Sequence, residues 1–164
     1  METEAAVKHV RISELDQAIE RVVHDVIGAA IEVHSELGPG LLEGIYEDAL
    51  EIELSLRGLK VERQVFMPVV YKGRRVRDQR MDMLVERCLI VENKCAKAVS
   101  DGEKQQLRSY LRAAGLPLGL IFNFREAMLR DGLYRIYNER AVHFRLPNQS
   151  PPSSSSGSAS SSSR

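Results

Sequence analysis

In the segment LIVENKCAK, Leu89 to Lys97, an apolar run leads directly into charged residues. Side chains alternate along a β-strand, so Glu92 and Lys94 share one face while Asn93 points to the other. Burial of an unpaired charge is unfavourable, and buried charges are normally neutralised, paired or bound to a metal. The segment therefore predicts a strand that presents Glu92 and Lys94 together, either as an ion pair or as a chemical site.

The preceding apolar segment predicts a neighbouring strand that carries another carboxylate, Asp82. Alternation predicts one face formed by Met81, Met83 and Val85 and another formed by Arg80, Asp82 and Leu84. A two-residue hairpin loop (86–87) would pair Asp82 with Val91 and leave Glu92 on the opposite face. A three-residue loop (86–88) would pair Asp82 directly with Glu92, with Cβ atoms about 4.5–5.5 Å apart.

Two carboxylates at that separation repel each other unless a proton or a cation lies between them. Mg²⁺ suits such a site, since it binds one or two protein carboxylates and keeps water ligands that a phosphate can displace. Lys94 would then orient a water molecule or neutralise developing charge, and metal-assisted phosphodiester hydrolysis is the chemical hypothesis. The same spacing arises by chance in a chain with 28% charged residues, as a structural ion pair.

The remaining periodicities and turn signals predict the element order ααβββαββ, an α/β (α+β) fold with a mixed β-sheet flanked by helices. The expected helices are Ser13–Glu36, Leu41–Arg57 and Gly102–Ala114. The expected strands are Val61–Tyr71, with Pro68 indicating an edge strand or a bulge, and Val76–Val85, Leu89–Cys95, Leu118–Phe124 and Leu133–Asn138.

Length and composition predict one domain at residues 8–146 and a disordered Ser/Pro-rich tail at 147–164. The formal net charge is zero, so the overall charge of the chain predicts no polyanion partner. Any affinity for nucleic acid would have to come from a local patch. The two cysteines, Cys88 and Cys95, fit no metal-binding spacing and are expected to be reduced. No membrane span or secretion signal is evident, so a cytoplasmic protein is expected.

The turn YKGRRVRDQR is strongly cationic, with Lys72, Arg74, Arg75, Arg77 and Arg80 against a single acidic residue, Asp78. Such a patch could bind phosphates, with affinity that falls as salt rises. Alternatively, the charges protect an edge strand from aggregation. Both interpretations stay open. The turn has little aromatic interleaving, so base stacking on single strands is not expected.

Taken together, these motifs resemble the PD-(D/E)XK nuclease superfamily: Asp82, nine residues, Glu92-Asn93-Lys94, and then a helix with a Gln-x3-Tyr pattern at Gln106 and Tyr110. The segment GLLEGIY, Gly40 to Tyr46, resembles the signature of the small bacterial GxxExxY proteins within that superfamily. The similarity extends over residues 25–137. It implies a restriction-endonuclease-like core.

The resemblance also implies roles for individual residues. Asp82 and Glu92 would be ligands of Mg²⁺, or of Mn²⁺ in its place, and Lys94 the catalytic lysine. Glu43 would be the acidic residue that the first core helix directs at the site, and Gln106 and Tyr110 would line the site or position DNA. The alternative is a catalytically silent nuclease fold that serves as a binding or regulatory module. A domain of this size has no separate specificity module, so a homodimer or a protein partner is expected to supply one.

Several of these residues also have purely structural interpretations. Glu43 suits the first turn of a helix, where a carboxylate interacts favourably with the helix dipole. Tyr46 lies on an apolar stripe and is expected in the core, and His34 is expected to be a hydrogen-bonded, half-buried histidine. Asn93 departs from the apolar residue that most superfamily members have between Glu and Lys. It must find hydrogen bonds among apolar neighbours, and the strand was expected to end early there.

Overall fold

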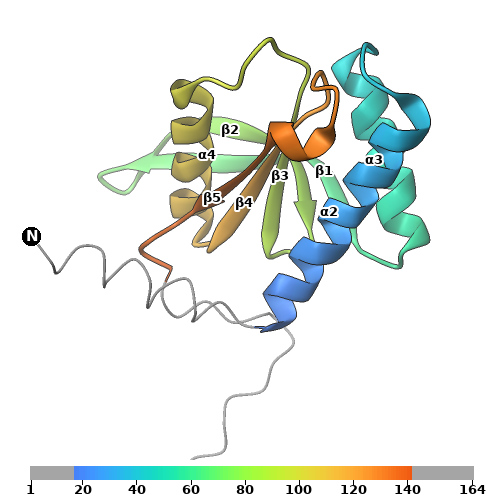
Figure 1. Cartoon of the computed structure of the whole chain (residues 1–164). Helices are drawn as coiled ribbons and strands as arrows, with labels where there is room; N and C mark the ends of the chain where they lie inside the picture. Colours follow the sequence, from blue (N-terminus) through green and yellow to red (C-terminus); the bar gives the residue numbers. More distant parts are fainter. Residues whose placement is uncertain (1–16, 142–164) are drawn as a thin grey trace, which may run out of the picture.

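The computed structural model describes residues 17–141. The expected domain limits at residues 8 and 146, the expected helix start at Ser13 and the tail at 147–164 lie outside this range. Within it, the order of helices and strands is the predicted ααβββαββ, with a short 3-10 helix, η1 (Leu129–Gly132), that the sequence did not indicate. Figure 1 shows these elements as a sheet with helices on both of its sides.

Two helices, α2 (Gln17–Leu37) and α3 (Glu43–Leu56), cover one face of the sheet (Figure 1). They form because apolar residues recur at helical spacing, as at Ile19, Val23, Val26 and Ala30, all buried. Positive φ angles at Gly38 and Gly40 turn the chain between them. No helix among residues 17–141 is long and apolar enough to cross a membrane.

The sheet has the order β1-β2-β3-β4-β5 over the described range, with the parallel pair β3–β4 at its centre and antiparallel pairs elsewhere. This confirms the predicted mixed sheet and the edge position of the strand with Pro68. The bounds are β1 (Val61–Tyr71), β2 (Arg74–Val85), β3 (Leu89–Lys94), β4 (Leu118–Asn123) and β5 (Leu133–Tyr137).

The central strand β3 separates two apolar clusters. Leu89 and Val91 pack with α2 and α3, whereas Ile90 packs with the other helix, α4 (Asp101–Ala114). Strand alternation therefore places Glu92 on the α4 side and Asn93 on the α2/α3 side. Glu92 and Lys94 therefore lie on the face of β3 that is covered by α4.

The helix α4 links the parallel strands β3 and β4 and is capped at both ends. Ser100 caps its start, since the Ser100 side chain accepts from the amide of Glu103 while Glu103 bonds back to Ser100. Gly115, in the left-handed conformation at φ 67°, ends the helix. These caps fix where α4 begins beside the end of β3.

The β1–β2 hairpin changes face at Gln64, which has a left-handed φ of 51°. Arg63 is paired with carboxylates of α3, whereas Val65 and Met67 pack in the cluster with Tyr110 of α4. The same change occurs on β2, where Met81 joins the α4 cluster and Met83 and Val85 the other. The prediction that Met81 shares a face with Met83 and Val85 was therefore wrong.

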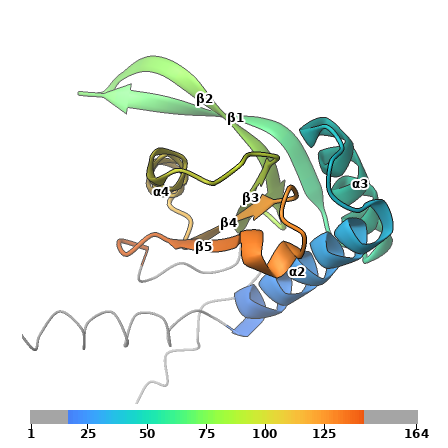
Figure 2. The same cartoon turned by 45° about the horizontal axis from the view of Figure 1, so that its top comes forward.

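Beyond this change, residues 65–81 form what we call the distal arm. Figure 2 shows the arm passing over α4, and in both views its tip lies beyond that helix.

Candidate active site

The hairpin register brings the two predicted carboxylates opposite each other. Strand β2 ends at Val85 and β3 begins at Leu89, with Leu84 paired to Ile90 and Met83 to Val91. The next pair in this register is Asp82 with Glu92, which confirms the three-residue alternative for the loop. Left-handed φ angles of 49° and 55° at residues 86 and 87 make the turn.

Hydrogen bonds connect the two carboxylates across the hairpin. The amide of Asp82 donates to Oε1 of Glu92 over 3.3 Å, and the amide of Asn93 donates to Oδ2 of Asp82 over 3.1 Å. Each carboxylate is therefore fixed by the backbone of the opposite strand. This exchange holds both groups in the plane between β2 and β3.

The Glu92 carboxyl is strongly perturbed by its surroundings. Glu92 is only 7% exposed. Burial, followed by the neighbouring charge of Asp82, raises the pKa of Glu92 to about 8, although Lys94 acts in the opposite direction. The place between the two carboxylates therefore attracts a proton or a cation.

Lys94 lies on the same face, with Nζ 3.8 Å from Oε2 of Glu92 and a side chain that is 22% exposed. It also faces the start of α4. Hydrogen bonding to Ser100 lowers the pKa of Glu103, and the charge of Lys94 lowers it further. The ammonium group is thus shared between the carboxylate pair and the capped end of α4.

The helix α4 contributes Tyr110 and Gln106 to the same side. Tyr110 is 5% exposed. Burial and the charges of Glu92 and Asp82 raise the pKa of Tyr110, whereas Arg80 and a hydrogen bond with Gln106 lower it. The Gln-x3-Tyr pair therefore lies beside the carboxylates.

Glu43 occupies a different place from the other acidic residues. Its Oε2 accepts from the amide of Cys95 over 3.2 Å, which holds the residue that follows β3. It makes no hydrogen bond or ion pair with Asp82, Glu92 or Lys94, and residues 17–141 contain no group of three or more His, Cys, Asp or Glu side chains placed to hold a metal ion. Within residues 17–141, the structure thus brings two carboxylates together here, Asp82 and Glu92, and not three.

Comparison with known families matches this geometry. The family model of the PD-(D/E)XK nuclease superfamily matches residues 20–136, a stretch that includes every residue of the site. The chain belongs to the PD-(D/E)XK nuclease superfamily. Searches of curated proteins and of solved structures gave no significant match.

Superfamily nucleases typically use divalent metal ions, and the donor set of this chain fits one. Asp82 and Glu92 offer hard oxygen ligands from a rigid hairpin, in a place whose electrostatics favour a positive charge. The two donors are both carboxylate oxygens, without a thiol or an imidazole beside them in the described part of the chain. An oxygen-only donor set is typical of Mg²⁺ and Mn²⁺ sites and not of a structural zinc site.

The basic residues of the turn lie on the distal arm, and all of them except Arg80 are five or more residues from Asp82 along the strand. Arg77 is five residues before Asp82, about 16 Å along an extended strand. Lys72, Arg74 and Arg77 are exposed, and Arg75 forms an ion pair with Asp78. The structure does not bring these side chains into contact with the catalytic candidates of this superfamily protein.

An ion-pair cluster between α3 and β1 was missed by sequence reasoning. Arg63 binds Glu47, Asp48 and Glu51 at 2.8–3.0 Å. Burial opposes the charge of Arg63, but the hydrogen bonds that its guanidinium donates to these carboxylates raise its pKa. Gln64 also donates to Oε1 of Glu47 over 2.7 Å. The cluster fixes Gln64, which lies opposite Asp82 in the register.

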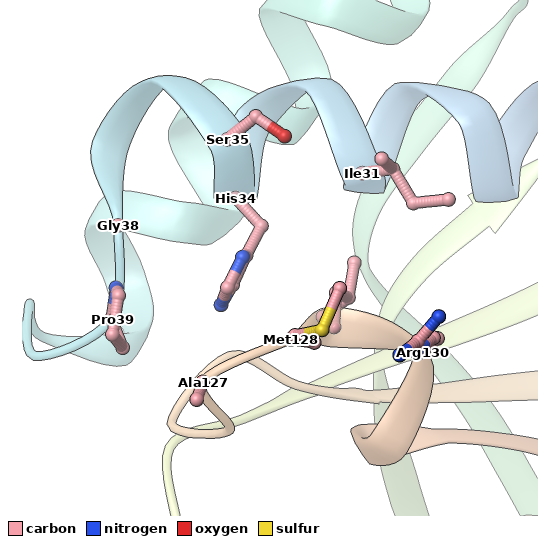
Figure 3. Close-up of a pocket in the computed structure, with 9 residues that line it drawn as sticks. Ile31, His34, Ser35, Gly38, Pro39, Ala127, Met128 and Arg130 are labelled. Atoms are coloured by element: carbon pink, nitrogen blue, oxygen red, sulfur yellow. The ribbon is translucent and has the colours of Figure 1, made fainter.

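Two structural predictions concern the α2/α3 side of the sheet. Tyr46 is fully buried, stacked on Phe124 at 4.5 Å, and its hydroxyl donates to the carbonyl of Gly38, so its core position is confirmed. His34 is hydrogen-bonded through Nε2 to the carbonyl of Glu126 at 2.8 Å, which confirms a satisfied histidine, but it is buried and not half-buried as expected. Figure 3 shows His34 pointing from α2 into a pocket of about 550 Å³ near Met128.

The side chain of Asn93 is buried, but it is only partly hydrogen-bonded. Its side-chain amide nitrogen lies 3.5 Å from the sulfur of Met83, and Oδ1 has no hydrogen-bond partner among residues 17–141. The strand continues through Asn93 and ends at Lys94, one residue before the expected Cys95. Parallel pairing of Asn93 with Phe122 on β4 holds the backbone in place.

Proposed function

We propose that this protein hydrolyses phosphodiester bonds in DNA with the help of Mg²⁺, or of Mn²⁺ in its place. The observation that carries the proposal is the direct opposition of Asp82 and Glu92 across the hairpin, with the ammonium of Lys94 3.8 Å from Glu92. Membership of a nuclease superfamily supports the reaction class.

In this proposal, Asp82 and Glu92 would hold the cation, which supplies polarisation of the phosphodiester and a more acidic water. Lys94 stabilises negative charge that develops on the phosphate or orients the attacking water. Tyr110 and Gln106 line the α4 side and position the substrate backbone. Because Glu92 is 7% exposed, the reacting groups on this side are shielded from bulk solvent.

Glu43 acts in the proposal as a positioning residue. Its bond to the amide of Cys95 fixes the end of β3 one residue after Lys94. The GxxExxY signature then has two functions in this chain, since Glu43 holds β3 while Tyr46 packs in the core. We propose on this basis that the chain is a GxxExxY protein.

DNA phosphates are proposed to bind Lys72, Arg74 and Arg77 on the distal arm, with Tyr110 closer to the carboxylates. Arg75 contributes less, since it is paired with Asp78. A homodimer or a protein partner would supply sequence specificity.

A catalytically silent binding module is the second candidate function. The ion pair between Lys94 and Glu92 favours it, because a closed network of this kind can serve stability without any metal.

The deciding experiment is a divalent-metal titration of cleavage on DNA and RNA substrates, with Asp82→Asn, Glu92→Gln and Lys94→Ala beside the wild type. Each variant is expected to lower the cleavage rate by at least about a hundredfold, as loss of a charged group in a reacting site does. Asp25→Asn, an exposed carboxylate on α2, is the matched control and keeps the wild-type rate.

Calorimetry separates the two candidates. For the nuclease, the wild type binds Mg²⁺ or Mn²⁺ and Asp82→Asn does not. A wild type that neither binds metal nor cleaves would support the silent binding module, and cleavage that persists in all three variants would refute the site.

A further inference from the structure

The distal arm concentrates positive charge in a protein whose formal net charge is zero. Residues 65–81 contain five basic side chains and one acidic side chain, Asp78, and that one is paired with Arg75. Among the described residues, no carboxylate pairs with the other four, which are Lys72, Arg74, Arg77 and Arg80. An isolated cationic segment of this kind favours a polyanionic partner.

The arm also exposes two aromatic rings, which the turn sequence did not lead us to expect. Phe66 is 64% exposed near the base of the arm, and Tyr71 is 65% exposed at its tip. Phe66 is paired directly with Arg80, and the ammonium of Lys72 lies 5.5 Å from the centre of the Tyr71 ring. Aromatic rings beside free cations are the features that bind single-stranded nucleic acids.

A second copy of this chain is a poorer occupant for the same surface. Pro68 interrupts the edge strand β1 and has no amide hydrogen for a further strand. Two arms placed edge to edge would also bring like charges together.

We propose that the distal arm binds a single-stranded segment of nucleic acid, whose bases stack on Phe66 and Tyr71 while the free cations contact its phosphates. The proposal rests on the proposed nuclease function and names its substrate class: nucleic acid with a single-stranded region next to the cleaved bond.

The position of the arm relative to the carboxylates supports this assignment. Arg80 is two residues before Asp82, and its charge acts on Tyr110 beside the site. Phe66 and Tyr71 are about 17 Å apart along β1, at positions of opposite parity. A single-stranded nucleic acid that contacts both rings therefore crosses the open edge of β1. From there it follows the arm towards Asp82.

The test measures binding of a labelled single-stranded oligonucleotide and of its duplex by fluorescence anisotropy, in metal-free buffer so that nothing is cleaved. Phe66→Ala and Tyr71→Ala are each expected to weaken single-strand binding by about 5- to 150-fold, the effect of losing one stacked base. Duplex binding is expected to change less than about threefold. Phe66→Tyr keeps an aromatic ring and is expected to bind the single strand with the affinity of the wild type.

Val70→Ala and Val76→Ala are the matched controls, because both side chains are as exposed as the rings on the same arm but cannot stack. They are expected to bind like the wild type. Circular dichroism checks that every variant is folded.

Two results would overturn the proposal. The first is unchanged single-strand affinity, or an equal loss for single strand and duplex. The second is a wild-type dimer, seen by light scattering, that Phe66→Ala dissociates without changing oligonucleotide affinity. Failure of the nuclease function is a separate result, since ring-dependent binding without metal-dependent cleavage would reject hydrolysis and retain the arm assignment.

Discussion

Glu92 combines burial with a neighbouring carboxylate, and this makes the metal-free protein sensitive to pH. Its pKa is about 8 in the folded chain and 4.5 as an ordinary carboxyl. Between these values the folded chain binds more protons than the unfolded chain. The free energy of unfolding therefore falls as pH rises, by at most about 1.4 kcal/mol per pH unit.

Replacing Glu92 with Gln removes this titration while keeping the shape of the side chain. In metal-free buffer the variant is expected to be more stable than the wild type at pH 8, and the difference is expected to disappear below about pH 4.5. Urea unfolding at a series of pH values measures it. Parallel stability curves for the two proteins would show that Glu92 does not hold the extra proton.

Asn93 illustrates a residue whose environment the sequence could locate but not satisfy. Alternation correctly placed it on the face opposite Glu92, among apolar side chains. The sequence could not show that Oδ1 would remain without a partner. A buried, unsatisfied carbonyl costs about 1–3 kcal/mol. Asn93, between Glu92 and Lys94, therefore lowers the free energy of unfolding of the chain.

At the scale of elements, the ion-pair cluster fixes helix α3 to strand β1. Glu47 is 7% exposed and depends on Arg63 and Gln64 for its hydrogen bonds. A buried carboxylate that loses its partner is left with an uncompensated charge, which is strongly destabilising.

Arg63→Met is therefore expected to lower the free energy of unfolding by about 1–3 kcal/mol, less than for a fully buried pair because the Arg63 side chain is 28% exposed. The double variant with Glu47→Met is expected to recover most of that loss. Chemical denaturation of the single and double variants measures the coupling. Additive losses would show that the two side chains act independently.

The elements themselves could be predicted because their periodicities are strong, as the match of β1 to its expected Val61–Tyr71 bounds shows. The register at Asp82 could only be narrowed to two alternatives. The choice depends on tertiary bonds between Glu86 and Lys60, which no local pattern reveals. The change of face at Gln64 was missed for the same reason, since a hydrogen bond to Glu47 accompanies its left-handed backbone.

At the scale of the whole molecule, the tip of the distal arm (residues 70–76) lies outside the core, whereas the base of the arm packs into it through Val65, Met67 and Met81. All residues from 70 to 76 are exposed. Val69 and Arg77 are paired across the hairpin, so a short turn could join them directly. The arm tip therefore adds no buried side chain to the core, and its side chains are accessible for the proposed contacts with nucleic acid.

Replacing residues 70–76 with Asn-Gly, a pair that favours a tight hairpin turn, tests this separation. The free energy of unfolding is expected to change by less than about 1 kcal/mol, because no buried side chain is removed. DNA affinity is expected to fall and to depend less steeply on salt, since three cations are lost. Equal DNA affinity and salt dependence in both proteins would exclude the tip as a phosphate contact.

The parallel pairing of β3 with β4 has a consequence for synthesis of the chain on the ribosome. When residues up to Lys94 have emerged, Asp82 and Glu92 are already present, but the apolar strand Leu89–Lys94 still lacks one of its neighbours. That open edge is available to other nascent chains until Leu118–Asn123 has been translated. Protection of the central strand from misassembly therefore comes late in translation.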